Sequence, residues 1–242
     1  MKPLAGKTAL VIGGSRGIGR AIVERYAADG AKVAFSYLQR EQTATDLASA
    51  VAKNGGTAIP LRADLGKTDD IRALFNEAEK ALGGLDIVVA NAAIAIAKPV
   101  VELTEADFDQ VFAVNTKGTF VALQEAARRV RNGGRIIVTS TGGTKMLMTL
   151  MSLYLGSKGA VEQFVRVLAR EVGDRGITVN AVSPGYTDTE LLPERDRAVA
   201  ASSSPFNRVG QPEDVAEAFA FLAADSGRWV TGQNLAVGGG VF

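Results

Sequence analysis

The fold is decided by one short glycine-rich stretch, Gly13-Gly14-Ser15-Arg16-Gly17-Ile18-Gly19. It follows an apolar run over residues 7–12 that is typical of a strand, and it leads into a helical pattern over residues 17–29. Glycines let a backbone approach a pyrophosphate closely, and the start of the following helix offers free N–H groups to phosphates. Turns of this composition also occur without a ligand, but the strand–turn–helix context favours a nucleotide site.

Outward from this stretch, the chain alternates between strand and helix patterns. Strands are expected at residues 7–12, 32–37, 57–62, 85–90, 135–139, 177–182 and 234–237. Helices are expected at residues 17–29, 41–53, 68–82, 153–172 and 212–223, with a kinked or broken helix over 104–131 and a loop-rich stretch over 183–209. The alternation predicts an α/β, doubly wound Rossmann fold, with seven parallel strands and helices on both faces, in one domain over residues 1–242.

The composition excludes several kinds of active site. The 242 residues include no histidine and no cysteine, which removes Ser-His-Asp and Cys-His nucleophiles, disulfides, and zinc, haem and iron–sulfur sites. We therefore expect no metal, and acid–base chemistry is left to Tyr, Lys, Asp and Glu. A net charge of +1 gives no basic surplus for nucleic acid or an anionic membrane. Because no signal peptide or long apolar run is present, we expect a cytoplasmic protein.

The end of the second expected strand bears on which dinucleotide is bound. NAD sites usually place Asp or Glu there, on the ribose 2′-hydroxyl, but this chain has Ser36 and Tyr37, followed by Arg40. Arg16 in the glycine stretch supplies a second cation, and two cations without a carboxylate suit a 2′-phosphate. The alternative is that both arginines are solvated surface residues. We expect NADP, as NADPH, in preference to NAD.

Tyr154 and Lys158 form the candidate acid–base pair. They lie four residues apart near the start of an expected helix, so they share one helix face. A phenol has a pKa near 10, and a neighbouring ammonium favours the phenolate. The pair therefore suits the interconversion of an alcohol and a carbonyl. Such spacing also arises by chance, and the position of the pair after a strand that ends in Ser140-Thr141 adds weight to it.

Together these residues resemble the short-chain dehydrogenase/reductase family, over nearly the whole chain. The glycine stretch is similar to the family's Thr-Gly-x3-Gly-x-Gly pattern, with Ile12 where Thr is usual, and Tyr154-x3-Lys158 matches its catalytic pair. Asn91-Ala92-Ala93 resembles its Asn-Ala-Gly segment, with Ala93 in place of Gly. The resemblance implies cofactor contacts at Gly13, Ser15, Gly17, Ile18, Gly19, Asp64, Leu65, Asn91, Ala92, Ala93, Tyr154, Lys158, Pro184, Gly185, Thr187 and Thr189.

The resemblance also implies a mechanism, in which hydride passes from a nicotinamide to a carbonyl carbon. Tyr154 protonates the oxygen, while Lys158 lowers the pKa of Tyr154 and binds the nicotinamide ribose. Asn115 looks like the helix asparagine that holds a water for proton relay. The family usually has Ser thirteen residues before the tyrosine, where this chain has Thr141. The Thr141 hydroxyl can donate to a carbonyl oxygen in the same way, and Ser140 is the alternative.

The expected walls of the substrate pocket carry flexible apolar side chains. Met146, Met148 and Met151 lie between the hydroxyl and the tyrosine, where they would form an adaptable wall or pack against the core or another subunit. Tyr186 and Leu191 lie in a lid-like stretch over residues 185–206. These side chains favour a ketone with an apolar body as the substrate.

Within the family, the chain most resembles 3-oxoacyl-[acyl-carrier-protein] reductases and related ketone or sugar dehydrogenases, which implies a homotetramer. Arg131 and Arg175 lie roughly where carrier-dependent members place docking cations. Both can equally be interpreted as ordinary solvated charges at helix ends. Two other functions stay open at this point. One is a different chemistry on the same fold, such as a dehydratase or an epimerase. The other is a nucleotide-binding regulator that no longer catalyses, which the changes at Ile12, Ala93 and Thr141 would fit.

Overall fold

The computed structural model describes residues 2–242, which form one seven-stranded sheet with the order β3-β2-β1-β4-β5-β6-β7. Every neighbouring pair of strands is parallel. The strands are β1 (Thr8–Ile12), β2 (Lys32–Tyr37), β3 (Thr57–Arg62), β4 (Leu85–Ala90), β5 (Val130–Thr139), β6 (Thr178–Pro184) and β7 (Asn234–Val237). The predicted doubly wound parallel sheet is confirmed.

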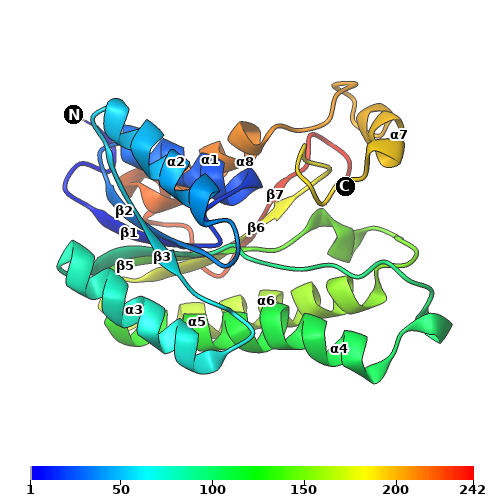
Figure 1. Cartoon of the computed structure of the whole chain (residues 1–242), viewed down its shortest axis with the longest axis horizontal. Helices are drawn as coiled ribbons and strands as arrows, with labels where there is room; N and C mark the ends of the chain where they lie inside the picture. The colour runs from blue at the N-terminus through cyan, green and yellow to red at the C-terminus, as the bar shows by residue number, and fades with distance from the viewer. Residues whose placement is uncertain (1) are drawn as a thin grey trace.

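Helices cover both faces of the sheet (Figure 1). One face carries α1 (Gly17–Ala28), α2 (Glu41–Lys53) and α8 (Pro212–Ala223), and the other carries α3 (Thr68–Leu82), α4 (Glu105–Phe112), α5 (Thr119–Arg129) and α6 (Ser152–Glu171). Because side chains alternate along a strand, Ala9 and Val11 of β1 enter one core while Leu10 and Ile12 enter the other. The sheet is therefore buried on both sides, as its near-continuous apolar strands predict.

The strand order reverses between β1 and β4, and this position determines where a ligand can bind. Ile12 pairs with Ala90, and Thr139 at the end of β5 pairs with Val182. The segments that follow β1, β4, β5 and β6 therefore meet at one edge of the sheet. In open α/β sheets, ligands bind in the crevice at this edge, where the order of the strands reverses.

Three elements differ from the sequence-based expectations. β5 begins at Val130 rather than at residue 135. The chain passes very close to β4 at Gly134, because a Cβ on this glycine would lie 2.6 Å from the Asp86 carbonyl oxygen. The expected break in the helix over 104–131 is a π-helical turn, Ala113–Gly118. The loop-rich stretch contains a short helix, α7 (Arg197–Ser202), which lies on the same side of the molecule as the C-terminus in Figure 1.

The helices of residues 2–242 are all too short or too polar to cross a lipid bilayer.

Candidate active site

The glycine stretch folds into a tight cradle between β1 and α1. Gly13 and Gly17 have φ values of 80° and 51°, in the left-handed region that favours glycine. A Cβ on Gly13 would lie 2.6 Å from the Ala92 Cβ, and a Cβ on Gly19 would overlap the Gly13 carbonyl oxygen. No side chain caps the start of α1. The N–H groups of its first turn are therefore directed at the space above the cradle, where an anion is stabilised.

Two of the expected cofactor residues hold this cradle from beneath. The Ser36 hydroxyl accepts a hydrogen bond from the Gly13 N–H (2.8 Å), and Ser36 is only 1% exposed. The Asn91 Nδ2 donates to the Gly13 carbonyl oxygen (2.9 Å), and the Thr139 hydroxyl donates to the Asn91 Oδ1 (2.9 Å). The Ser36 hydroxyl is therefore buried against the loop it supports, and a direct contact of Ser36 with the cofactor stays a prediction.

Arg16 and Arg40 lie close together, as expected for two cations that bind one anion. In the structure, the anion between them is the carboxylate of Glu190. Both guanidinium groups contact Glu190, and the Arg40 Nη2 lies 3.1 Å from the Glu190 Oε2. The hydrogen bond from Arg40, together with the charges of both arginines, lowers the pKa of Glu190. Sequence reasoning missed Glu190, because it lies 150 positions from Arg40 and no local motif marks it.

The other expected cofactor residues lie along the same edge of the sheet. Thr189 packs on the glycine stretch, since a Cβ on Gly17 would lie 3.1 Å from the Thr189 Cγ2. Thr187 is 7% exposed, its hydroxyl donates to the Gly185 carbonyl oxygen (3.1 Å), and it lines a hollow together with Tyr186. The remaining members of the set follow or end strands at this edge or belong to the cradle: Ser15, Ile18, Tyr37, Asp64, Leu65, Ala92, Ala93, Pro184 and Gly185.

Tyr154 and Lys158 lie one turn apart at the start of α6. The Lys158 Nζ donates to the Thr139 carbonyl oxygen (2.7 Å) and lies 5.9 Å from the centroid of the Tyr154 ring. Burial lowers the pKa of Lys158 to about 8, and the negative charge of Glu162 opposes this fall. The Lys158 ammonium therefore loses its proton as the pH rises through about 8.

The pKa of Tyr154 moves in the opposite direction from the one expected. Burial raises it, and the hydrogen bond with the Thr141 side chain offsets only part of the rise. The Lys158 ammonium does not reverse this effect, because it is directed at the Thr139 carbonyl oxygen. Tyr154 therefore keeps its proton, which is the form that donates to a carbonyl oxygen.

The structure separates the two candidate hydroxyls at the end of β5. Ser140 is 2% exposed, and its hydroxyl donates to the Glu162 Oε1 (2.6 Å). The Thr144 hydroxyl donates to the same oxygen (2.8 Å). The Thr141 side chain instead lies close enough to Tyr154 to lower its pKa, and the Thr141 hydroxyl accepts from the Gly143 N–H (3.1 Å). The geometry thus brings Thr141, and not Ser140, to the tyrosine, and it adds Glu162, which sequence reasoning missed.

Asn115 lies in the π-helical turn and is fully buried. Its Oδ1 accepts from the Ile94 N–H (2.9 Å), and its Nδ2 donates to the Ile94 carbonyl oxygen (2.8 Å) and to the Ser157 hydroxyl (3.0 Å). Ser157 in turn donates to the Tyr154 carbonyl oxygen (2.6 Å). Asn115 therefore connects the segment after β4 to the helix that carries Tyr154. Both side-chain N–H groups of Asn115 are used in these bonds, so the side-chain amide nitrogen cannot donate a further hydrogen bond to a water.

Comparison with known proteins identifies the chain. A family model described as enoyl-(acyl carrier protein) reductase matches residues 12–242. Versicolorin reductase of Emericella nidulans is 41% identical, over 99% of this chain and 97% of the relative. The chain belongs to the short-chain dehydrogenase/reductase family. It is therefore an oxidoreductase, and the resemblance seen in its sequence is confirmed.

Solved structures of short-chain dehydrogenases/reductases have nearly the same fold. One from Burkholderia cenocepacia, in complex with NADP, is 39% identical, with a TM-score of 0.95 and 99% of each chain covered. An angucycline C-6 ketoreductase with bound NADP is also 39% identical, with a TM-score of 0.95, and the match covers 99% of this chain and 96% of the ketoreductase.

Phe242, at the C-terminus, lies beside the loop that is expected to form one wall of the substrate pocket in this short-chain dehydrogenase/reductase. Met146, Met148 and Met151 are half-buried in the loop between Thr141 and Tyr154. The Phe242 ring fills the space that a Cβ on Gly142 or on Gly238 would enter. Phe242 therefore packs directly against the residue that follows Thr141.

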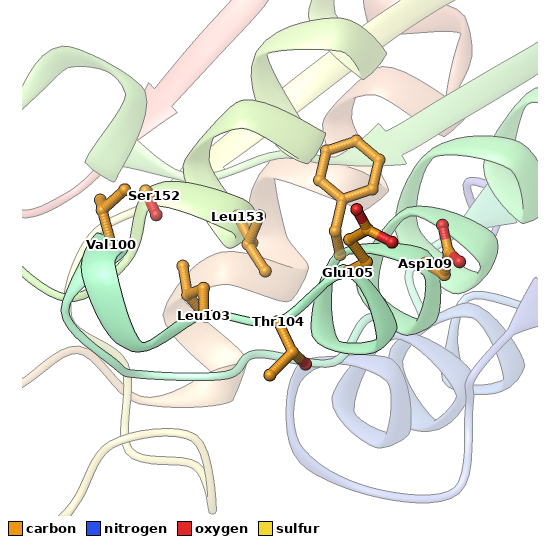
Figure 2. A pocket seen from close by; sticks show the side chains of 8 residues that line it. Val100, Leu103, Thr104, Glu105, Asp109, Ser152 and Leu153 are labelled. Atoms are coloured by element: carbon orange, nitrogen blue, oxygen red, sulfur yellow. The ribbon is translucent and has the colours of Figure 1, made fainter.

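Two hollows lie near this region. One, of about 180 Å³, is lined by Tyr186 and Phe206 of the lid-like stretch together with the end of β7. Leu191, expected beside it, is 57% exposed. Figure 2 shows the other, of about 400 Å³, which lies between α4 and the start of α6 and contains none of the expected site residues.

Within residues 2–242, no cluster of acidic side chains is arranged to hold a metal.

The two arginines considered for carrier docking form contacts with neighbouring groups of the same chain. The Arg131 Nη2 donates to the Gly83 carbonyl oxygen (2.6 Å), and its Nη1 lies 3.3 Å from the Asp86 Oδ2. The Arg175 guanidinium donates to the Asn132 Oδ1 (3.0 Å) and to the carbonyl oxygens of Ala127 and Val130. These contacts give both arginines a structural role that needs no carrier protein.

Proposed function

We propose that this enzyme reduces a ketone to a secondary alcohol with NADPH, and that it catalyses the reverse reaction as well. The observation that carries the proposal is that Ser140 is directed to Glu162, whereas the Thr141 side chain lies near Tyr154, a phenol that keeps its proton, at the sheet edge where the glycine cradle lies. Two such donors can share one carbonyl oxygen.

The cofactor assignment rests on the fit of the residues present. The glycine cradle and the uncapped start of α1 suit a pyrophosphate. Arg16 and Arg40 already hold a carboxylate between them, so they can hold another anion of similar geometry, such as a 2′-phosphate. Relatives of the same fold bind NADP. When bound, the nicotinamide supplies the hydride.

The side chains of this enzyme then have distinct roles. Thr141 donates a hydrogen bond to the carbonyl oxygen, and Tyr154 gives its proton to the same oxygen as negative charge develops there. Lys158 is charged below a pKa of about 8 and supports the ribose and the phenol. Asn115 holds the segment after β4 against α6, so that a water can carry protons toward Tyr154.

We also propose that the enzyme is a homotetramer. The outer face formed by α4, α5 and α6 exposes apolar side chains: Phe108 is 46% exposed, Phe120 48% and Val167 57%. The end of α8 and the segment that follows it expose Phe221 (43%) and Trp229 (95%). Two apolar patches on different sides of one chain fit the two interfaces of a tetramer with dihedral symmetry.

The proposal is tested by following absorbance at the NADPH band with a panel of ketones. We expect oxidation of NADPH with ketones that carry an apolar body, and a much lower kcat/KM with NADH. Binding of NADPH without turnover of any ketone would indicate a regulator. A strong preference for NADH would contradict the cofactor assignment.

A further inference from the structure

Glu190 joins three segments that are far apart in the sequence. It lies in the lid-like stretch after β6, whereas Arg16 belongs to the glycine cradle and Arg40 follows β2. Its carboxylate contacts both guanidinium groups. The preceding residue, Thr189, packs on Gly17. The carboxylate of Glu190 therefore fastens the lid-like stretch across the glycine cradle.

We propose that Glu190 is a specificity-determining residue that competes with the 2′-phosphate of the cofactor for Arg16 and Arg40. The inference rests on the proposed use of NADP. A carboxylate and a phosphate monoester both present two neighbouring oxygen atoms, to which a guanidinium group can donate paired hydrogen bonds. The two anions cannot both occupy the arginines closely, because like charges repel each other. Glu190 must leave before the 2′-phosphate is bound fully.

The charges decide which cofactor is affected by this competition. Two guanidinium groups and one carboxylate leave a net single positive charge, whereas a 2′-phosphate brings about 1.5 to 2 negative charges near neutral pH. NADP therefore displaces Glu190, and part of its binding free energy is used to break the Glu190 ion pairs. NAD has no group that needs the arginines, so its binding leaves these ion pairs intact. Glu190 thus lowers the affinity for NADP selectively.

The rest of the lid-like stretch has separate anchors. Arg197 donates to Asp188 (2.7 Å), and Thr187 forms a strand-like bridge with Gly210. These contacts do not involve the glycine cradle. Release of Glu190 therefore frees the stretch only near Thr189 and Glu190, and the segment as a whole stays attached to the protein.

The expected gain in affinity for a 2′-phosphorylated ligand follows from how exposed the three side chains of the ion pairs are. The side chains of Arg16, Glu190 and Arg40 are 55%, 53% and 52% exposed. Ion pairs at such exposure are weak and are screened by salt. We expect removal of the Glu190 charge to tighten binding of a 2′-phosphorylated ligand about three- to tenfold at low salt, with a smaller gain at high salt.

The test uses calorimetric titration of the full chain with two fragments, adenosine 2′,5′-bisphosphate and 5′-AMP, which lacks the 2′-phosphate. Three proteins are compared: wild type, Glu190→Gln and Glu194→Gln. Glu194 is a matched control, because it is a carboxylate of the same stretch that pairs with Arg197 (2.6 Å), away from Arg16 and Arg40, and is 89% exposed. We expect Glu190→Gln to bind the bisphosphate more tightly and 5′-AMP unchanged, and Glu194→Gln to match wild type with both fragments.

The outcomes separate this inference from the proposed function. If wild type prefers the bisphosphate but Glu190→Gln gains no affinity for it, the competition is absent and the NADP assignment stands. If wild type has no such preference and Glu190→Gln does not create one, both fail. If Glu190→Gln creates a preference that wild type lacks, the competition is real and the cofactor assignment is the part that fails. Weaker bisphosphate binding in Glu190→Gln would also overturn the inference.

Discussion

Ser140 donates a hydrogen bond to Glu162 across 2.6 Å, from the end of β5 to the middle of α6. The Thr144 hydroxyl donates to the same carboxylate oxygen, so Glu162 joins two hydroxyls of the loop to the catalytic helix. Successive side chains of a strand point in opposite directions. The bond to Glu162 therefore directs Ser140 into the protein and leaves the Thr141 hydroxyl beside Tyr154.

Removal of each hydroxyl in turn tests whether Thr141, and not Ser140, donates to the substrate oxygen. We expect Thr141→Ala to lower kcat/KM for a ketone by about 100-fold or more, because a donor to the developing alkoxide is lost. Ser140→Ala should instead lower the free energy of unfolding by about 1–3 kcal/mol, because a buried hydrogen bond to a carboxylate is lost. Steady-state kinetics and thermal unfolding measure the two effects. Thr141→Ser, which restores a hydroxyl, should recover most of the activity.

The assignment would be contradicted if the larger loss of turnover came from Ser140→Ala. It would also be contradicted if Thr141→Ala lost stability but kept its kcat/KM.

Glu162 should also affect the pH dependence of the reaction. Burial lowers the pKa of Lys158 to about 8, so Lys158 is an ammonium below this pH and becomes neutral as the pH rises through it. We expect kcat/KM for NADPH to fall in the same range, because the ribose loses its charged partner. Glu162→Gln removes the negative charge that favours the ammonium. It should therefore shift this fall to lower pH, as measured by the pH profile of kcat/KM.

Glu171→Gln is the matched control for this measurement. It removes a carboxylate from the exposed end of the same helix, and its pH profile should match wild type. A fall that moves to higher pH in Glu162→Gln, or that does not move, contradicts the proposed charge interaction.

The glycine cradle can be tested with two alanine substitutions. A Cβ on Gly19 would overlap the Gly13 carbonyl oxygen, whereas a Cβ on Gly159 in α6 would meet nothing within 4 Å. We expect Gly19→Ala to weaken NADPH binding at least tenfold, since backbone strain of about 1–3 kcal/mol would distort the loop. Gly159→Ala should bind NADPH normally and gain about 0.5–1 kcal/mol of stability. Fluorescence titration and thermal unfolding provide the readouts, and normal binding by Gly19→Ala would argue against the cradle.

Most of the fold could be predicted because its signals are local. Apolar runs bounded by glycines predicted all seven strands, and Gln211 followed by Pro212 marks the start of α8 as observed. The short helix α7 escaped prediction because it buries only Ala200, so its sequence carries no apolar periodicity. The early start of β5 escaped because the pair Gly133-Gly134 is typical of a turn, whereas here it permits a close approach to β4.

The candidate site was predictable only where its residues belong to a motif. Tyr154 and Lys158 are adjacent on a helix, so their spacing reveals them. Glu162 and Glu190 act through partners from other segments, and nothing near them in the sequence indicates those contacts. Ser36 is a different case, because the structure gives its hydroxyl a partner within the protein. A polar residue at the end of a strand suggests a ligand contact, but its burial directs the hydroxyl to the Gly13 N–H.

The role of Tyr154 as the proton donor is tested most directly by Tyr154→Phe, which removes only the hydroxyl. The measurement compares ketone-dependent NADPH oxidation with NADPH binding in the same preparation. We predict that turnover falls by about 10²- to 10⁴-fold, because the general acid is lost, and that the Kd for NADPH stays close to the wild-type value. Turnover at the wild-type rate by Tyr154→Phe would contradict the account.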